Sequence, residues 1–293
     1  MRSALAAGRP IRARRIDLEY PADSLPRYFM AGGDPVMSAF TAVLSAFFPE
    51  GEDYFVRSVR SYRDAIEDAE LRARVAGFIG QEAMHGREHR RFNTHLAARG
   101  YPTRAIDRVV RWSAKLSESV PGRSRRLAAT AAFEHYTATW AELFLRDAAV
   151  RAMADVDEVR QLLCWHALEE CEHKDVAFDV YQQAVGDERI RRWTMNAVTV
   201  WFVSMLASWM AVSLLIDGNT YRHPRRVARG LRELARSPFL SRPFRSRVGD
   251  YNRHGFHPDD HDTSELLAAW EHRLFGTTGE LAERLSNAEP APA

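Results

Sequence analysis

The sequence predicts an all-α protein built on a four-helix bundle. Long segments with a helical pattern end at strong breakers, such as Gly100 with Pro102 and Pro121 with Gly122. No segment has the sustained alternation of apolar and polar residues that indicates a β-strand. Hydrophobic residues make up 46% of the 293 residues, which is enough to form a sizeable core.

The chain divides into four parts. Residues 1–35 are rich in proline and glycine and are expected to form an irregular arm. Residues 36–190 are expected to form the bundle, and 191–220 an apolar helix. Residues 221–293 are expected to form a C-terminal extension of helices and loops.

Within the bundle, a helical pattern begins at Val36, is interrupted by Pro49, and resumes in a segment that has Glu52 in its first turn. The shorter helix after Gly100 leaves room for the long crossover connection of ferritin-like bundles. The other helices are expected at Asp68 to about Arg99, 103–118, 124–150 and 155–185.

Two Glu-x-x-His pairs mark the second and fourth long helices, and one further histidine lies four residues before the second pair. Each pair also has its own lone glutamate on the preceding long helix. Glu52 is 30 residues before Glu82, and Glu134 is 36 residues before Glu170. One Glu from each of two helices, with Glu-x-x-His from each of the other two, is the ligand set of dimetal carboxylate bundles. The candidate metal ligands are therefore Glu52, Glu82, His85, Glu134, His166, Glu170 and His173.

The spacing explains how these side chains could share a site. Residues three apart on a helix lie about 60° apart on one face, so each pair can reach one point. Carboxylates can bridge two cations while imidazoles act as neutral terminal ligands. We expect two metal ions, with iron preferred and manganese or zinc as alternatives. The competing interpretation is a solvated helix surface, but the neighbours of Glu82 and Glu134 are apolar.

Neighbouring side chains are expected to support the ligands without binding metal themselves. His89 lies one turn after His85, and Glu169 lies beside the second pair, so both are second-shell candidates. A hydrogen-bonded helix histidine with no role at the site is the alternative for His89. Glu172 is expected to be a surface charge. No catalytic residue is expected beyond the metal ligands.

Charge and cysteine usage limit the partners and the compartment. The net charge of +2 gives no reason to expect a nucleic-acid partner. Cys164 and Cys171 lie on one predicted helix about 10 Å apart, too far for a disulfide. We expect a reducing, cytoplasmic setting, since the N-terminus lacks the apolar stretch of a secretory signal.

Residues 193–216 contain no charged side chain and are long enough to span a bilayer. Arginines precede them, and Trp193 stands at the boundary, where interfacial aromatics are common. The alternatives are membrane contact, a buried fifth helix, and a homodimer interface.

The chain resembles the bacterial family of predicted metal-dependent hydrolases, which is ferritin-like. The resemblance runs from about residue 10 to 260 and implies a metal centre. It rests on FFPEGEDYFVRSVR (47–60), GFIGQEAMHGREH (77–89), FEHYTA (133–138), WHALEECEHKDVAFDVY (165–181) and GFHPDD (255–260).

The metal-site motif is also similar to that of the di-iron arylamine N-oxygenases, in which a third histidine joins the cluster. The chain departs from those enzymes in overall sequence, so their amine substrate does not carry over. By that similarity, Glu82 and Glu170 would bridge the metals, with Glu52 and His85 on one metal and Glu134, His166 and His173 on the other.

These observations lead to three functional hypotheses. The first is a non-haem di-iron oxidase or oxygenase that activates O2 to oxidise a small or lipid-like organic substrate, with an electron donor as partner. It is motivated by a carboxylate-rich ligand set without a separate nucleophile. The alternatives are a metal-dependent hydrolase that uses a metal-bridged hydroxide, and a non-catalytic metal-binding protein.

Overall fold

The computed structural model describes residues 10–20 and 25–285, and it is all-α over these residues, as predicted. The first nine residues of the predicted arm lie outside them. Within the described chain, the only β-type pairings are two isolated bridges, Ile16 with Leu285 and Met30 with Ala154. The helices are α1 (Pro35–Arg60), α2 (Ala69–Ala98), α3 (Thr103–Ser119), α4 (Arg123–Arg146), α5 (Ala148–Arg151), α6 (Asp157–His173), α7 (Val176–Ala184), α8 (Glu188–Leu215), α9 (Gly218–Arg222), α10 (Pro224–Arg236), α11 (Arg242–Asp250) and α12 (Ser264–Phe275).

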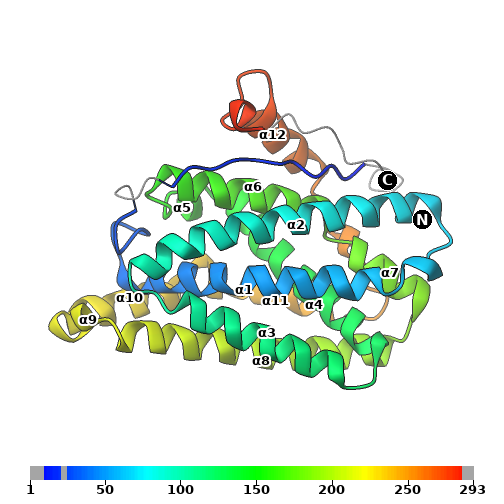
Figure 1. Ribbon diagram of the computed structural model, residues 1–293, viewed down its shortest axis with the longest axis horizontal. Helices are drawn as coiled ribbons and strands as arrows, with labels where there is room; N and C mark the ends of the chain where they lie inside the picture. The colour runs from blue at the N-terminus through cyan, green and yellow to red at the C-terminus, as the bar shows by residue number, and fades with distance from the viewer. Residues whose placement is uncertain (1–9, 21–24, 286–293) are drawn as a thin grey trace.

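Four long helices, α1, α2, α4 and α6, pack against one another and surround a common core (Figure 1). Helix α3 covers α1, and α8 packs across α4 and α1. Aspartates cap three of the helices: Asp34, Asp68 and Asp187 accept hydrogen bonds from backbone N–H groups in the first turns of α1, α2 and α8. The predicted ends of α2 and α3 are confirmed to within one residue.

Helix α1 does not stop at Pro49, so the predicted interruption is wrong. Proline lacks the N–H that would bond to the carbonyl four residues earlier, which belongs to Ser45. The side-chain amide of Asn93 on α2 donates to that carbonyl instead, at 2.9 Å. A tertiary contact thus replaces the missing helix hydrogen bond.

The predicted helix 155–185 is two helices, because α6 ends at His173 and α7 begins at Val176. The side chains at the break are held from outside the helix. Lys174 donates to the carbonyl oxygen of His261 at 2.5 Å, and Asp175 accepts from Arg74 at 2.5 Å. The break therefore reflects contacts with α2 and the C-terminal loop. The predicted helix 124–150 likewise ends early, at Arg146, and Asp147 caps the short α5.

The arm over residues 10–20 lies along α2 and α6 (Figure 1). Glycines on α2 permit this close approach, because a Cβ at Gly77 would lie 2.4 Å from the carbonyl oxygen of Ile11. A Cβ at Gly80 would lie 2.8 Å from the Cβ atom of Ala13. The arm thus occupies space that only glycine leaves free.

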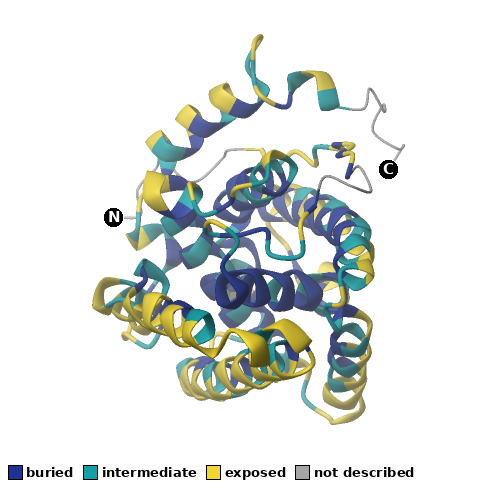
Figure 2. Cartoon of the chain, turned by 90° about the vertical axis from the view of Figure 1, so that its left-hand side faces the viewer, coloured by how far each residue is buried: buried dark blue, intermediate teal, exposed yellow. Residues whose placement is uncertain are grey.

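Helix α8 is the one described helix that is long and apolar enough to cross a membrane, judged by length and composition alone. Only about a fifth of its most apolar window is buried within this chain, so most of that window lies at the surface of the molecule. Exposed residues gather on the helices at the lower side of the molecule in Figure 2, while the central helices are buried. Cys164 and Cys171 are both buried and free, as expected.

Candidate metal centre

All seven predicted ligands meet in the buried core of the bundle. Helix α1 carries Glu52, α2 carries Glu82 and His85, and α4 carries Glu134. The other three lie on successive turns of one face of α6. Their relative exposures range from 0 to 4%, so the solvated-surface interpretation is wrong for all of them: Glu52, Glu82, His85, Glu134, His166, Glu170 and His173.

The side chains form two groups that share one glutamate. In the first group, ligand atoms of Glu52, His85, His166 and Glu170 lie within 4.8 Å of one another. In the second, the same holds for Glu82, Glu170 and His173. Glu170 is therefore placed where a carboxylate could bridge two cations.

Glu134 joins the second group through His173. Nε2 of His173 lies 3.3 Å from Oε2 of Glu134 and 3.2 Å from Oε1 of Glu82. In the first group, Nε2 of His166 lies 2.9 Å from Oε1 of Glu170 and 3.6 Å from Oε1 of Glu52. His166 thus lies on the Glu52 side, whereas the similarity to the N-oxygenases placed it with Glu134 and His173.

The donor atoms lack the partners that buried polar groups normally have. Among the described residues, both carboxylate oxygens of Glu52, Glu82 and Glu134 are buried without a hydrogen bond. The same is true of Nδ1 of His85 and Nε2 of His173. Buried polar atoms are nearly always paired, and buried charges are paired or coordinate metals. Oxygen and imidazole nitrogen donors that converge without protein partners fit a pair of divalent cations.

The electrostatics of the cluster favour the binding of a cation. Burial, followed by repulsion from neighbouring carboxylates, raises the pKa of Glu52, Glu82 and Glu134 well above the ordinary value. Burial also lowers the pKa of His85, which favours the neutral imidazole that binds metal. Burial acts against ionisation of Glu170 as well, but contacts with His173 and His166 hold its pKa well below the usual range.

Each of the three histidines contacts a neighbouring side chain through the ring nitrogen that faces away from the other candidate ligands. Nε2 of His85 lies 3.0 Å from Oε2 of Glu169. Nδ1 of His166 lies 2.7 Å from Nε2 of His89, whose Nδ1 lies 2.9 Å from the Ser45 hydroxyl. Partners of this kind fix the tautomer and orientation of metal-binding imidazoles. His89 and Glu169 therefore lie where the sequence predicted supporting residues.

The third partner, Gln81, was missed by sequence reasoning. Its amide nitrogen donates to the carbonyl of Arg12 at 3.1 Å and to Glu172 at 2.7 Å. Its oxygen is therefore turned toward His173, whose Nδ1 donates to it at 2.9 Å. Position 81 directly precedes Glu82, but nothing in the local pattern marks it as a partner of α6.

Glu172 is not the surface charge that the sequence predicted, because its side chain is only 5% exposed. Arg14 of the arm donates to both of its oxygens, at 2.7 and 2.8 Å, and also to Glu169 at 3.2 Å. Burial raises the pKa of Glu169 to about 8, against the influence of Arg14. The arm thus supplies a cation directly behind the cluster.

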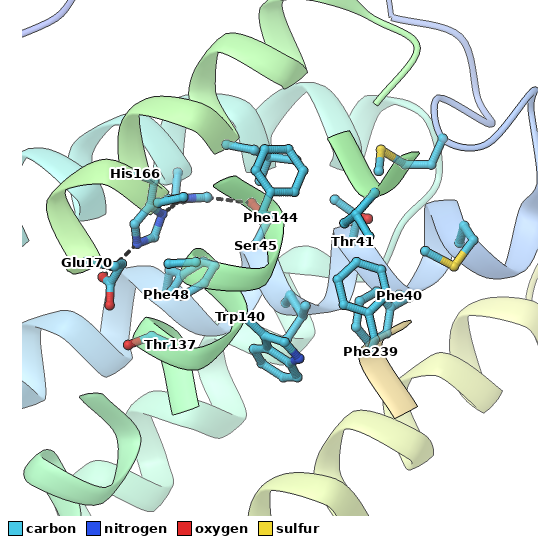
Figure 3. A pocket seen from close by; sticks show the side chains of 18 residues that line it. Phe40, Thr41, Ser45, Phe48, Thr137, Trp140, Phe144, His166, Glu170 and Phe239 are labelled. Atoms are coloured by element: carbon cyan, nitrogen blue, oxygen red, sulfur yellow. Dashed lines mark hydrogen bonds and ion pairs between the residues drawn. The ribbon is translucent and has the colours of Figure 1, made fainter. Parts of the chain in front are cut away.

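Two cavities reach the cluster. A small one of about 100 Å³ is lined by His166 and Glu170 together with apolar side chains such as Phe48 and Phe144 (Figure 3). A larger one of about 820 Å³ lies between α1, α3, α4 and α8 and includes Glu52 in its wall. The cluster can therefore be approached along apolar surfaces.

The C-terminal loop, residues 251–262, is rich in histidine and aspartate, but its described residues form no group with metal-binding geometry. Nε2 of His257 lies 2.8 Å from Asp179, and its side chain caps the turn at Asp259 and Asp260. Within the described residues, the groups with metal-binding geometry all belong to the bundle core.

A family model described as "predicted metal-dependent hydrolase" matches residues 12–262. No curated protein and no solved structure matches the chain, so the ferritin-like topology stays a prediction. The match includes all four ligand-bearing helices and most of the arm that holds Glu169 and Glu172. The chain therefore belongs to the family of predicted metal-dependent hydrolases.

Proposed function

We propose that the protein is a metal-dependent hydrolase whose centre binds two divalent cations. One observation carries the proposal: four carboxylates and three imidazoles converge in a buried core, with most donor atoms unpaired. Family membership favours hydrolysis over the oxidation expected from the ligand motif alone.

The proposed ligands fall into the two groups seen in the geometry. Glu52, His85 and His166 would hold one cation, and Glu82, Glu134 and His173 the other, with Glu170 between them. Cations bound there would supply Lewis acidity toward a carbonyl or phosphoryl oxygen and lower the pKa of a bound water.

The surrounding side chains would orient the imidazoles and exclude bulk water. Glu169, Gln81 and His89 each hold one histidine by its outward nitrogen. Aromatic rings pack against the histidines: Phe48 lies 4.5 Å from the His166 ring and Trp165 lies 4.9 Å from that of His85. Hydrogen bonds in such an apolar site are stronger than in water. His89 and Ser45 also form a path by which a proton could leave His166.

Metal analysis combined with a substrate panel tests the proposal. The protein loaded with zinc or manganese should bind about two ions per chain and hydrolyse members of an ester, amide and phosphoester panel at the same rate with and without O2. A Glu82→Gln/Glu134→Gln variant should lose one ion and the activity. A fully loaded protein that hydrolyses no member of the panel would contradict the proposal.

Oxygen chemistry on a di-iron centre is the second candidate, and the shared Glu170 between two Glu/His groups is the observation that favours it. It would require an electron donor as partner. Iron loading without O2, followed by exposure to O2, should then consume O2 and change the visible spectrum. Iron that binds but does not react would eliminate this candidate.

A further inference from the structure

The larger cavity is apolar along most of its length. Its volume of about 820 Å³ falls within the range of small-molecule sites, roughly 300–1,000 Å³. Few polar groups enter it, so a ligand with many hydrogen-bonding groups would lose its hydration without compensation. Its walls are largely aromatic and include Phe47, Phe55, Phe133, Trp140, Trp201 and Phe202.

The cavity joins the molecular surface to the candidate metal centre. Glu52, in its wall, is 1% exposed. At the other extreme, Trp112 on α3 and Trp193 on α8 also line it and are 64% and 77% exposed. A chain-like ligand could therefore place one end at Glu52 while its remainder passes between α3 and α8.

The rim of the cavity continues into an exposed, mainly apolar stripe on α8, which also carries Asn196 and Ser204. Its apolar members are Trp193, Ala197, Val200, Val203, Ala207 and Ala211. These positions recur every three or four residues, so they share one helix face. No charged residue occurs from Trp193 to Ile216. The opposite face, with Met195, is buried against the bundle, which keeps α8 in place as a helix lying flat on the molecule.

Basic residues precede this stripe in the sequence and recur on α10, which follows α8 and α9. Arg189 and Arg192 precede it, and α10 carries exposed arginines that recur along one face. In the described chain none of these arginines forms an ion pair, and Glu233 is the sole acidic residue of α10. Such a pattern of apolar stripe, interfacial tryptophans and arginines complements an anionic lipid surface. The arginines of the α10 face are Arg225, Arg229, Arg232 and Arg236.

We propose that the α3–α8 face docks on an anionic bilayer and that the cavity takes the hydrocarbon chain of a single-chain amphiphile, with its reacting group at Glu52. This inference rests on the proposed function and names its substrate class. The bilayer supplies the amphiphile at the mouth of the cavity, between Trp112 and Trp193.

Chain binding is tested on the metal-loaded full-length protein with the fluorescent fatty acid cis-parinaric acid, displaced by dodecan-1-ol. Ala129→Phe and Ser113→Phe place a ring in the cavity from α4 and α3, and each should weaken binding about tenfold or more. Ala207→Phe adds the same ring on the exposed stripe, outside the cavity, and should bind as wild type. Absence of binding to wild type, or binding by both cavity variants that equals that of wild type, would overturn the inference.

Docking is tested by co-flotation with vesicles of equal parts phosphatidylcholine and phosphatidylglycerol. Val200→Glu/Val203→Glu should bind about tenfold more weakly than wild type. Ala148→Glu/Ala149→Glu on α5, at the opposite edge of the molecule in Figure 1, adds the same charge and should bind normally. Equal binding by the two variants would overturn the docking, and so would a stable homodimer that Val200→Glu/Val203→Glu dissociates.

These measurements do not depend on turnover. A protein that binds the chain and the vesicles but hydrolyses nothing would contradict the proposed function alone. An active hydrolase that binds neither would contradict this inference alone.

Discussion

Nε2 of His85 lies 3.0 Å from Oε2 of Glu169, and both side chains are fully buried. A cation at Nδ1 of His85 would leave the ring proton on Nε2, where it is donated to the Glu169 carboxylate. Arg14 contacts the other oxygen of Glu169 and so favours its ionised form. A buried arginine, carboxylate and imidazole thus form a line that ends at the proposed metal.

Glu169→Gln should weaken metal binding without unfolding the protein. The amide keeps the shape of the carboxyl group but cannot take up the negative charge that a cation on His85 would favour at Glu169, whose pKa burial raises to about 8. Loss of such a partner typically costs 10–100-fold in metal affinity, and we expect an effect of about that size. Competition against a chelator of known affinity measures it.

Glu158→Gln, in the first turn of the same helix, is the control and should leave the affinity unchanged. If Glu169→Gln bound metal as tightly as wild type, the orienting role of Glu169 would be refuted.

Glu134→Gln should change stability in opposite directions with and without metal. Burial raises the pKa of Glu134, and a carboxyl group whose pKa rises on folding destabilises the folded state above its unfolded pKa. Removing that group should therefore stabilise the metal-free protein at neutral pH by about 1–3 kcal/mol. The loaded variant should instead be less stable than loaded wild type, because a ligand is lost.

Thermal unfolding with chelator measures the change in stability of the metal-free protein, and thermal unfolding with excess metal measures that of the loaded protein. The advantage of the metal-free variant should shrink as the pH falls toward the ordinary glutamate pKa, about 4.3, because the wild-type carboxyl is then protonated in both states. A variant that is less stable than wild type in both conditions would show that Glu134 is held by something other than a cation.

The sequence could single out the candidate ligands because each motif is local. Glu and His three residues apart on one helix must share a face, so Glu82–His85 and Glu170–His173 could be found without any tertiary information. Apolar neighbours correctly indicated that Glu134 is buried.

The residues that sequence reasoning misplaced depend on contacts between distant segments. Arg14 reaches Glu172 across 158 residues, and Gln81 reaches His173 across 92. The helical pattern of α6 carries no sign of an irregular arm that lies against it. An arginine in a proline-rich segment and a glutamate on a polar helix position both look solvated when read locally. Their pairing in the interior is a property of the fold.

The continuity of α1 through Pro49 gives a third prediction. Asn93→Asp keeps the acceptor for the Ser45 hydroxyl but removes the donor to the Ser45 carbonyl, so it should destabilise the protein by about 1–3 kcal/mol. Pro49→Ala restores a backbone N–H four residues after Ser45. In that background the cost of Asn93→Asp should be smaller.

Denaturant unfolding of the two single variants and the double variant yields the coupling energy between positions 49 and 93. We expect a coupling of at least about 0.5 kcal/mol, since both groups serve one carbonyl. Strict additivity would mean that Asn93 does not compensate for the proline.

Two glycine-to-alanine changes should have opposite effects, because the new methyl group meets the arm in one and open space in the other. At Gly77 the added Cβ would be 2.4 Å from the backbone oxygen of Ile11, so the arm must move away from α2. That movement would withdraw Arg14 from Glu169 and Glu172. Gly77→Ala should therefore lower metal affinity and speed tryptic cleavage at Arg14.

At Gly51, in α1, the Cβ meets no atom within 4 Å, and Gly51→Ala should stabilise the protein by about 0.5–1 kcal/mol. The pair separates displacement of the arm from the general effect of alanine in a helix. Equal cleavage rates in Gly77→Ala and wild type would show that the arm does not need the space at Gly77 and that its hold on the cluster is independent of α2.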